Sequence, residues 1–451
     1  MNARRQGLSD PSVDFILRNC RIMNTGGTEP QFAVDLEDNH KHTKGWVIDG
    51  CEFQNNTNGD IIIKGASQGQ IINCTFKQNS YSLKGVEGNL GLAIDTGYGR
   101  YITISNNNFI YKDVSLDIAT LFTDNQAYNS RLTLKPGGCM VKDNLFVNSQ
   151  INGGIYIGEQ NSQSAGGDGA ISYVEDNVFR YNEGWGNSRW SYDQNSIAWI
   201  NNKFLFNDKI INAKVINEEN LRDILIGSTS NTYMRSDGST ANLPKHQGYS
   251  KSNDFTGLKA IPSQMHAIGM TKFASNLENE IINFPLLIEN GYAKNFHIKN
   301  TTAYTLWLKL GEYATDGIGA FTTIKIKDSE FTVPANIDAN EGYLNNSQYG
   351  GTQLQNFLRV RKDVNVNLIF KNCDFTSEDT TTGLFMYLGN RGTTTFIDCT
   401  FDAPNAENID FTNTGSERTS GVYAGANTGA ITITNATTPG NRITFTGATV
   451  N

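Results

Sequence analysis

The sequence predicts an all-β solenoid of stacked coils, and three observations support this prediction. A six-residue phrase recurs: an apolar residue, a free position, Asn, Asp or Gly, then Cys, Asn or Ser, another free position, and an apolar residue that is nearly always Phe. Val, Ile, Thr, Phe and Tyr dominate the chain, as they do in β-strands. The copies also recur at a period of about 20 to 50 residues, which is typical of stacked-repeat proteins.

Ten copies share the phrase. They are Leu17–Ile22, Ile48–Phe53, Ile71–Phe76, Ile104–Phe109, Val141–Phe146, Val174–Phe179, Trp199–Phe204, Ile326–Phe331, Phe370–Phe375 and Phe396–Phe401. A weaker copy, Ile298–Ala303, lies in the gap between the seventh and eighth. The repeats therefore cover most of residues 17–402.

The phrase predicts its own local geometry. Strand alternation points the first and third positions to one side, yet the fourth and sixth positions also hold interior-type residues, so the alternation slips once between positions three and four. Asn, Asp and Gly tolerate the left-handed backbone that a sharp bend requires. Each phrase is therefore predicted to be two short strands that meet at a tight corner, with copies stacked in parallel about 4.8 Å apart. Phe then stacks on Phe, and Cys or Asn on Cys or Asn.

With these phrases the chain resembles the right-handed parallel β-helix superfamily, which includes pectate-lyase-like enzymes and bacteriophage tailspikes. The resemblance implies a right-handed parallel β-helix (solenoid) with lateral loop insertions and a short β-rich C-terminal tail. It is specific for the fold but not for the chemistry, because one fold hosts many activities. A β-sandwich with coincidental repeats is the alternative fold.

The predicted organisation has five parts. They are an N-terminal lead-in (1–16), a first β-helical part (17–233) with long lateral loops at 80–200, an irregular insertion (234–295) with a short helical turn within 269–283, a second β-helical part (296–402), and a β-rich tail (403–451). For the tail, a capping or oligomerisation element and a loosely ordered end are both open.

The spacing of the Phe anchors indicates where function lies. Phe53 and Phe76 are 23 residues apart, whereas the next three intervals are 33, 37 and 33 residues. Three coils thus carry about 10 to 14 surplus residues each, and insertions in solenoids map to loops that often form the binding face. We therefore expect the functional region at residues 80–200.

Composition narrows the partners and the location. The net charge is −8 and no basic stripe exists, which argues against nucleic acid. No apolar run approaches the roughly 18 residues of a membrane span, and no apolar segment follows the charged start, so we expect no signal peptide. Because little precedes the first phrase, we expect another subunit or virion tail protein to cover that end. The expected location is the virion tail or the extracellular space.

The cysteines follow the phrase. Five of the six occupy its fourth position, namely Cys20, Cys51, Cys74, Cys373 and Cys399, and Cys139 is the exception. Because Asn and Ser fill this position elsewhere, we expect free, buried thiols, with a Cys51–Cys74 bridge as the alternative. The absence of a Cys-x-x-Cys pair argues against a thiolate zinc site.

An acidic and aromatic group is the best candidate for chemistry. Asp124, Glu159 and Asp193 lie 15, 13 and 14 residues after their Phe anchors, so a constant register places three carboxylates on one face. Paired carboxylates suit glycoside hydrolysis. Flat aromatic surfaces for sugar rings come from Tyr156, Trp185, Trp190 and Tyr192. The competing interpretation is that these carboxylates are solvated and these rings serve packing.

A lyase needs a base beside a carboxylate, and Asp95, Tyr98 and Arg100 bring an acid, a phenol and a guanidinium together, although a Gly-rich hairpin tip explains them equally well. We predict no metal site and no cofactor. Calcium is the alternative, because Asp338–Gly342 has part of a calcium-loop pattern but lacks the remaining ligands.

Two functional hypotheses result. The favoured one is a bacteriophage tail spike or fibre protein, a homotrimer that binds a host surface polysaccharide and degrades it if the carboxylates are catalytic. The alternative is a secreted pectate-lyase-like polysaccharide lyase or glycoside hydrolase. A purely structural solenoid is less consistent with the long aromatic-rich coils.

Overall fold

The structure is a computed structural model of the chain. It describes residues 8–9, 13–26, 31–37, 43–78, 91–97, 99–134, 137–147, 149–153, 172–181, 197–206, 223–226, 249–252, 254–257, 267–270, 276–279, 285–288, 296–303, 305–308, 322–333, 356–360, 366–377, 385–388, 390–403, 408–411, 429–439 and 443–451.

The chain forms two compact units, one of residues 1–220 with 230–248 and the other of residues 221–229 with 249–451. Both consist of parallel β-sheets, and the described ranges contain no α-helix. No described helix is therefore long and apolar enough to cross a membrane. The prediction of an all-β parallel solenoid is confirmed.

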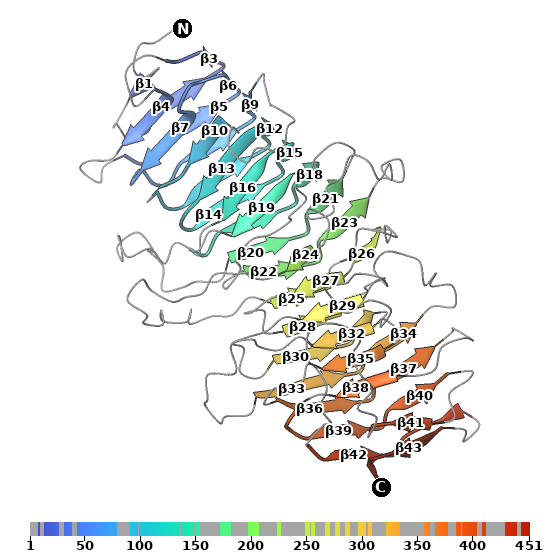
Figure 1. The fold of residues 1–451 in the computed structure, drawn as a ribbon. Coiled ribbons are helices and arrows are strands. Elements are labelled where there is room, and N and C mark those ends of the chain that lie inside the picture. The colour runs from blue at the N-terminus through green and yellow to red at the C-terminus, as the bar shows by residue number, and fades with distance from the viewer. Residues whose placement is uncertain are drawn as a thin grey trace. The chain divides into compact units, whose positions relative to one another are not determined.

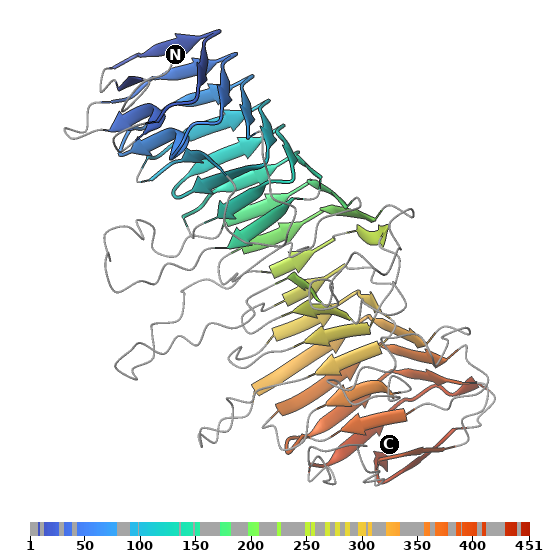
Figure 2. The ribbon, with the colours of Figure 1, turned by 45° about the horizontal axis from the view of Figure 1, so that its top comes forward.

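Unit 1 has three sheets, and each coil contributes strands to them in turn (Figures 1 and 2). Sheet A contains β1 (Leu8–Ser9), β4 (Phe32–Glu37), β7 (Gly59–Lys64), β10 (Gly91–Asp95), β13 (Lys112–Leu116), β16 (Arg131–Leu134) and β19 (Gln150–Gly153). Sheet B contains β2 (Ile16–Arg18), β5 (Val47–Asp49), β8 (Gln70–Ile72), β11 (Ile102–Ser105), β14 (Thr120–Thr123), β17 (Met140–Lys142), β20 (Ser172–Glu175) and β22 (Ile197–Ile200). Sheet C contains β3 (Arg21–Met23), β6 (Glu52–Gln54), β9 (Thr75–Lys77), β12 (Asn108–Ile110), β15 (Gln126–Tyr128), β18 (Leu145–Val147), β21 (Val178–Tyr181) and β23 (Lys203–Phe206).

Unit 2 repeats this plan. One sheet contains β24 (Asp223–Ile226), β27 (Ala267–Met270), β29 (Pro285–Ile288), β32 (Thr305–Leu308), β35 (Asn356–Val360) and β38 (Phe385–Leu388). A second contains β25 (Tyr249–Lys251), β28 (Asn276–Glu278), β30 (Phe296–Lys299), β33 (Thr322–Lys327), β36 (Val366–Lys371), β39 (Thr394–Ile397), β42 (Ile431–Thr434) and β44 (Thr449–Val450). A third contains β31 (Thr302–Ala303), β34 (Glu330–Val333), β37 (Asp374–Ser377) and β40 (Thr400–Asp402). The remaining strands are β26 (Asp254–Gly257), β41 (Asn408–Asp410) and β43 (Thr444–Thr446).

The third position of every phrase is a left-handed corner, as predicted. In unit 1 the backbone φ is positive at Asn19, Gly50, Asn73, Asn106, Asp143, Asp176 and Asn201, and in unit 2 at Asn300, Asp328, Asn372 and Asp398. The backbone N–H of each corner donates to a carbonyl of the next coil, as Asn106 N does to Thr123 O at 3.4 Å. The left-handed residue thus turns the chain and still takes part in the backbone hydrogen bonds between coils.

Four further corners belong to coils that the sequence pattern did not reveal. Positive φ values also occur at Asp124, Ser252, Asn279 and Asn435, between strands that pair with the neighbouring coils. The first of these coils was missed because its final apolar residue is Ala127 instead of Phe. The 37-residue interval from Phe109 to Phe146 is therefore two short coils and carries no lateral insertion.

Two local predictions differ from the structure. A helical turn was expected within 269–283, where β27 ends and β28 lies, and an irregular insertion was expected at 234–295, which contains the strands β25 to β29. The reason lies in the pairing of Leu277, which is 1% exposed and sits between strands on either side. Burying this side chain in a parallel sheet outweighs the weak local helical pattern. The tail also differs from a loosely ordered end, since β42 and β44 continue the sheet after β39.

The aromatic stack fills the core of unit 1. The ring centroids of Phe53 and Phe76 are 5.0 Å apart, and those of Phe76 and Phe109 are 4.9 Å apart. Where Ala127 interrupts the column, Phe122 of sheet B fills the volume, and its ring lies 5.6 Å from Phe109 and 6.5 Å from Phe146. The predicted stack is confirmed, with a detour at the coil that the pattern missed.

An interior ladder of asparagines follows the corners. The Oδ1 atom of each asparagine accepts the backbone N–H and the Nδ2–H of the previous one, at 2.8 to 3.1 Å. Each Nδ2 also donates to a backbone carbonyl of the sheet B strand in the preceding coil. The ladder comprises Asn107, Asn125, Asn144, Asn177 and Asn202, all buried.

Cysteines continue this ladder at its N-terminal end. Cys74 N donates to Asn107 Oδ1 at 2.8 Å, and Cys51 N lies 3.4 Å from Cys74 Sγ. All six cysteines are free thiols; Cys20 is half-buried and the others are buried. Burial raises the pKa of Cys139 to about 12, which keeps this thiol protonated near neutral pH.

Replacing Asn144 with Ala is expected to lower the unfolding free energy by about 3 kcal/mol, because it leaves several buried donors and acceptors without partners. Asp143→Asn, at the exposed corner next to it, is the matched control and should stay within about 0.5 kcal/mol. Urea unfolding of the full chain measures both. Equal stability of the two variants would contradict a structural ladder.

Candidate functional site

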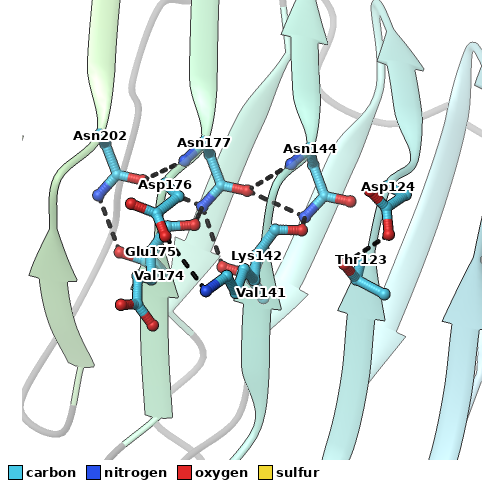
Figure 3. A network of polar contacts seen from close by, with 10 residues as sticks. All are labelled: Thr123, Asp124, Val141, Lys142, Asn144, Val174, Glu175, Asp176, Asn177 and Asn202. Carbon is cyan, nitrogen blue, oxygen red and sulfur yellow. Dashed lines mark hydrogen bonds and ion pairs between the residues drawn. The ribbon is translucent and has the colours of Figure 1, made fainter.

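An acidic column lies on the corner between sheets B and C. Asp124, Asp143 and Asp176 occupy this corner in three successive coils, and Glu175 precedes the last (Figure 3). Their side chains point outward, whereas the asparagine that follows each one points inward into the ladder. Neighbouring coils are about 4.8 Å apart, so the carboxylates repel one another unless a cation lies between them.

Lys142 supplies that cation. Its Nζ lies 3.2 Å from Asp176 Oδ2. The hydrogen bond to Asp176, together with the charges of Glu175, Asp176 and Asp143, raises the pKa of Lys142. Asp124 Oδ2 accepts a hydrogen bond from Thr123 Oγ1 at 3.0 Å. Lys142 therefore offsets only part of the charge, and the column remains an acidic surface that faces solvent.

Of the three predicted carboxylates, the structure describes Asp124 alone. Asp124 is the corner residue of the missed coil, and its neighbours in the stack are Asn106 and Asp143. In sequence, Glu159 follows the sheet A strand β19, and Asp193 follows the sheet C strand β21. Asp124 lies after the sheet B strand β14, because β13 and β14 both fit within the 15 residues that follow Phe109, whereas Glu159 and Asp193 precede β20 and β22 in sequence. Glu159 and Asp193 lie outside the described ranges, so the shared register stays a prediction.

Most of the other predicted site residues lie outside the described ranges. These are Glu159, Asp193, Tyr156, Trp185, Trp190, Tyr192 and Tyr98. Their roles stay predictions. Of the predicted lyase-type group, Asp95 and Arg100 are described.

The outer face of sheet A carries a polar patch in unit 1. Asp95 ends β10 and lies in register with Ser115 of β13 and then Thr133 of β16. In the adjacent row, Asp113 of β13 lies beside Arg131 of β16. All of these side chains are partly exposed and alternate with buried apolar residues. Strand alternation alone therefore brings residues 38 positions apart in sequence onto one surface.

Arg131 and Asp113 form a bidentate ion pair. Arg131 Nε donates to Asp113 Oδ1 at 2.7 Å, and Nη2 donates to Oδ2. Burial raises the pKa of Asp113, and the guanidinium opposes that shift. The pair fixes a planar guanidinium on the sheet surface.

The corner between sheets A and B presents an exposed ring. Tyr101 follows the exposed Arg100, is 67% exposed, and has a φ of 57°. Its backbone N–H donates to Ala119 O at 3.1 Å, so the residue is a corner of the ladder. On the same connection, Asp95 Oδ1 accepts a hydrogen bond from Gly97 N at 3.1 Å and tightens the turn.

A left-handed backbone is costly for tyrosine, and the cost is about 1 to 2 kcal/mol relative to the right-handed region. Asn or Gly would relieve it. The corresponding corners of unit 1 hold Asp14, Gly45, Gln68, Ala119 and Gly138, so the left-handed conformation belongs to the corner itself and is not specific to Tyr101.

Sequence reasoning missed Tyr101, Asp113 and Arg131. Tyr101 directly follows the predicted residue Arg100, but the local sequence pattern does not indicate that Tyr101 occupies a corner. The pairing of Asp113 with Arg131 follows from an 18-residue coil, which was invisible while Phe109 to Phe146 was counted as one coil.

The described residues contain no group of three or more side chains able to hold a metal ion. Asp338–Gly342, the segment with part of a calcium-loop pattern, lies outside them. No model of a known protein family matches the chain, and no curated protein is significantly similar to it. The site is therefore interpreted from its own chemistry.

Asp124→Asn is expected to leave the unfolding free energy within about 0.5 kcal/mol of the parent, whereas Asp124→Ala should lower it by about 1 kcal/mol, because Asn tolerates the left-handed corner and Ala does not. Urea unfolding measures both variants, and any polysaccharide-cleaving activity should persist in Asp124→Asn. Loss of such activity with unchanged stability would restore a catalytic role for Asp124.

Proposed function

We propose that unit 1 binds a polysaccharide on the outer face of sheet A and the adjoining corner. The single observation that supports this most is Tyr101, an aromatic ring that is 67% exposed and lies beside the exposed Arg100. An aromatic face offers an apolar surface to a sugar ring, while its hydroxyl remains wet. The carboxylates and guanidiniums of the patch suit the hydroxyl and acidic groups of a glycan.

The geometry of the patch favours an extended ligand. Parallel strands place equivalent side chains at a constant spacing of about 4.8 Å, so the polar rows run along the stack instead of closing around a point. A polymer of repeating units matches such rows better than a small molecule does. Tyr98, Tyr156, Trp185, Trp190 and Tyr192 are proposed as further contacts.

We further propose that the protein serves as a bacteriophage tail spike or fibre that recognises a host surface glycan, and that it acts as a homotrimer on the virion tail. Support comes from the parallel solenoid together with the polysaccharide-type surface. Light scattering or native mass spectrometry of the full chain should give three times the mass of one chain. A monomer at micromolar concentration would contradict the trimer but leave glycan binding intact.

The second candidate is a secreted polysaccharide lyase or glycoside hydrolase, with Glu159 and Asp193 as the remaining predicted catalytic pair. The raised pKa of Asp113 also fits an acid catalyst, although its ion pair with Arg131 argues for a structural role. Incubation with purified envelope polysaccharides separates these possibilities. New reducing ends indicate a hydrolase, ultraviolet-absorbing unsaturated products indicate a lyase, and retention without cleavage indicates a binder.

Tyr101→Asn tests the binding surface. It is expected to weaken polysaccharide binding about tenfold, which corresponds to the loss of about 1.4 kcal/mol of ring contact. Since Asn prefers the left-handed backbone, the unfolding free energy should not fall. Glycan-array binding and isothermal titration calorimetry measure the affinity.

Tyr111→Asn is the matched control, because Tyr111 is also a tyrosine at a left-handed corner (φ 55°) but lies between sheets C and A. Its affinity should equal that of the parent. Equal weakening by both variants, or by neither, would argue against this surface.

A further inference from the structure

Three buried polar side chains meet where sheet C turns into sheet A, away from the proposed glycan surface. Asn56 follows β6, Asp60 lies in β7, and Lys112 begins β13. The side chains of Lys112 and Asp60 are 0% exposed, and Asn56 is 1% exposed. The position of Lys112 is filled by Ser130 and Ser149 in the next two coils, so a lysine stands where small hydroxyl residues suffice.

One carboxylate holds both nitrogen groups. Lys112 Nζ lies 2.7 Å from Asp60 Oδ2, and Asn56 Nδ2 donates to Asp60 Oδ1 at 2.7 Å. The lysine spans the intervening strand β10 because its register partner there is Gly91. A Cβ on Gly91 would stand 3.2 Å from Lys112 Nζ, closer than nearly all real Cβ contacts.

The amide of Asn56 is held in place and polarised. Its Oδ1 accepts hydrogen bonds from Thr25 N and Thr25 Oγ1, both at 3.0 Å. Its Nδ2 also lies 3.3 Å from Ile22 O. The Thr25 hydroxyl has a single proton and also lies 3.0 Å from Gln31 O, so the backbone N–H is the fixed donor to this oxygen. A donor aimed at a carbonyl oxygen stabilises the negative charge that develops there during attack on the carbonyl carbon.

Burial favours the uncharged form of the Asp60 carboxyl group. An ammonium has three protons to satisfy, and among the described residues Asp60 is the only ion-pair partner of Lys112 Nζ. Burial raises the pKa of Asp60, an effect that the charge of Lys112 opposes. Transfer of one proton from the ammonium to the carboxylate gives an amine and a carboxylic acid, and a neutral amine is a nucleophile.

We propose that Lys112 and Asn56 form an intramolecular amide bond, with Asp60 as the acid–base group. The Nζ lone pair attacks Cγ of Asn56, and the new N–C bond places negative charge on Oδ1, which Thr25 holds. Asp60, protonated by the first transfer, gives that proton to Nδ2 and takes one from Nζ. The Cγ–Nδ2 bond then breaks, ammonia leaves, and Asp60 ends as the carboxylic acid.

The reaction needs no oxidant, metal or second molecule. It requires Nζ to move from Asp60 to within about 3 to 3.5 Å of Cγ. Attack of Nζ on Cγ of Asp60 is less consistent with the contacts. Hydroxide would then be the leaving group, and the neighbouring Asn56 amide is not an acid that could protonate it. The product would cross-link a turn in one coil to a strand two coils further on.

Intact mass spectrometry of the denatured full chain tests the proposal. The mass is expected to be lower than the sequence mass by one ammonia, and protease digestion should give a branched peptide that joins Lys112 to Asn56. A succinimide at an Asn–Gly step such as Asn58–Gly59 also loses ammonia, but it leaves the peptides unbranched. Full sequence mass, loss of water, or a branch to any other residue would overturn the proposal.

Variants assign the roles. Lys112→Arg and Asp60→Asn should both show the full sequence mass, because the first lacks a primary amine and the second lacks the proton carrier. Asn56→Asp should lose water instead of ammonia, with the branch at the same two positions. If a variant does not fold, the mass of the parent chain still decides the question. Polysaccharide binding is measured separately and does not depend on this bond.

Discussion

The fold depends on one left-handed residue in each coil. At that residue the strand alternation slips by one position, so the side chain before the corner faces outward and the side chain after it faces inward. The strand on each side of the corner keeps its pairing with the next coil. The inward residue is free to bond along the stack, and in unit 1 asparagine uses every polar atom of its side chain to do so. Hydrophobic burial of the Phe column alone would not fix the register so tightly, since apolar contacts are non-directional.

The phrase contains the elements of this constraint, which is why the fold could be predicted in detail from sequence. Prediction failed where one member of the phrase was replaced without loss of the geometry. Ala127 breaks the Phe column, yet Phe122 supplies the missing volume from another sheet. Ser252 forms a corner although Asn, Asp or Gly was expected. Substitutions that a neighbouring strand compensates leave no trace in a local pattern.

The candidate site could be predicted only in part, because function in a solenoid is built from residues that are distant in sequence and adjacent on the surface. Asp95 and Arg100 were found from local clustering. Asp113 and Arg131 could be joined only after the length of the coil between them was known, and the corner position of Asp124 became visible only with the coil that ends at Ala127. Register is therefore the quantity on which functional inference in this fold depends.

Register also explains why the buried charges are informative. Along the corner between sheets C and A, Ser130 and Ser149 satisfy the backbone with one hydroxyl each, at little cost. Placing Lys112 and Asp60 in the same interior requires desolvating two ionisable groups, and a buried ion pair seldom repays that cost by itself. The intervening strand places Gly91 beside the lysine, where a Cβ would crowd Gln78 Oε1 and Lys112 Nζ. Lys112, Asp60 and Gly91 all depart from the repeat at the same place, which argues for chemistry there. A single departure would be consistent with a neutral substitution.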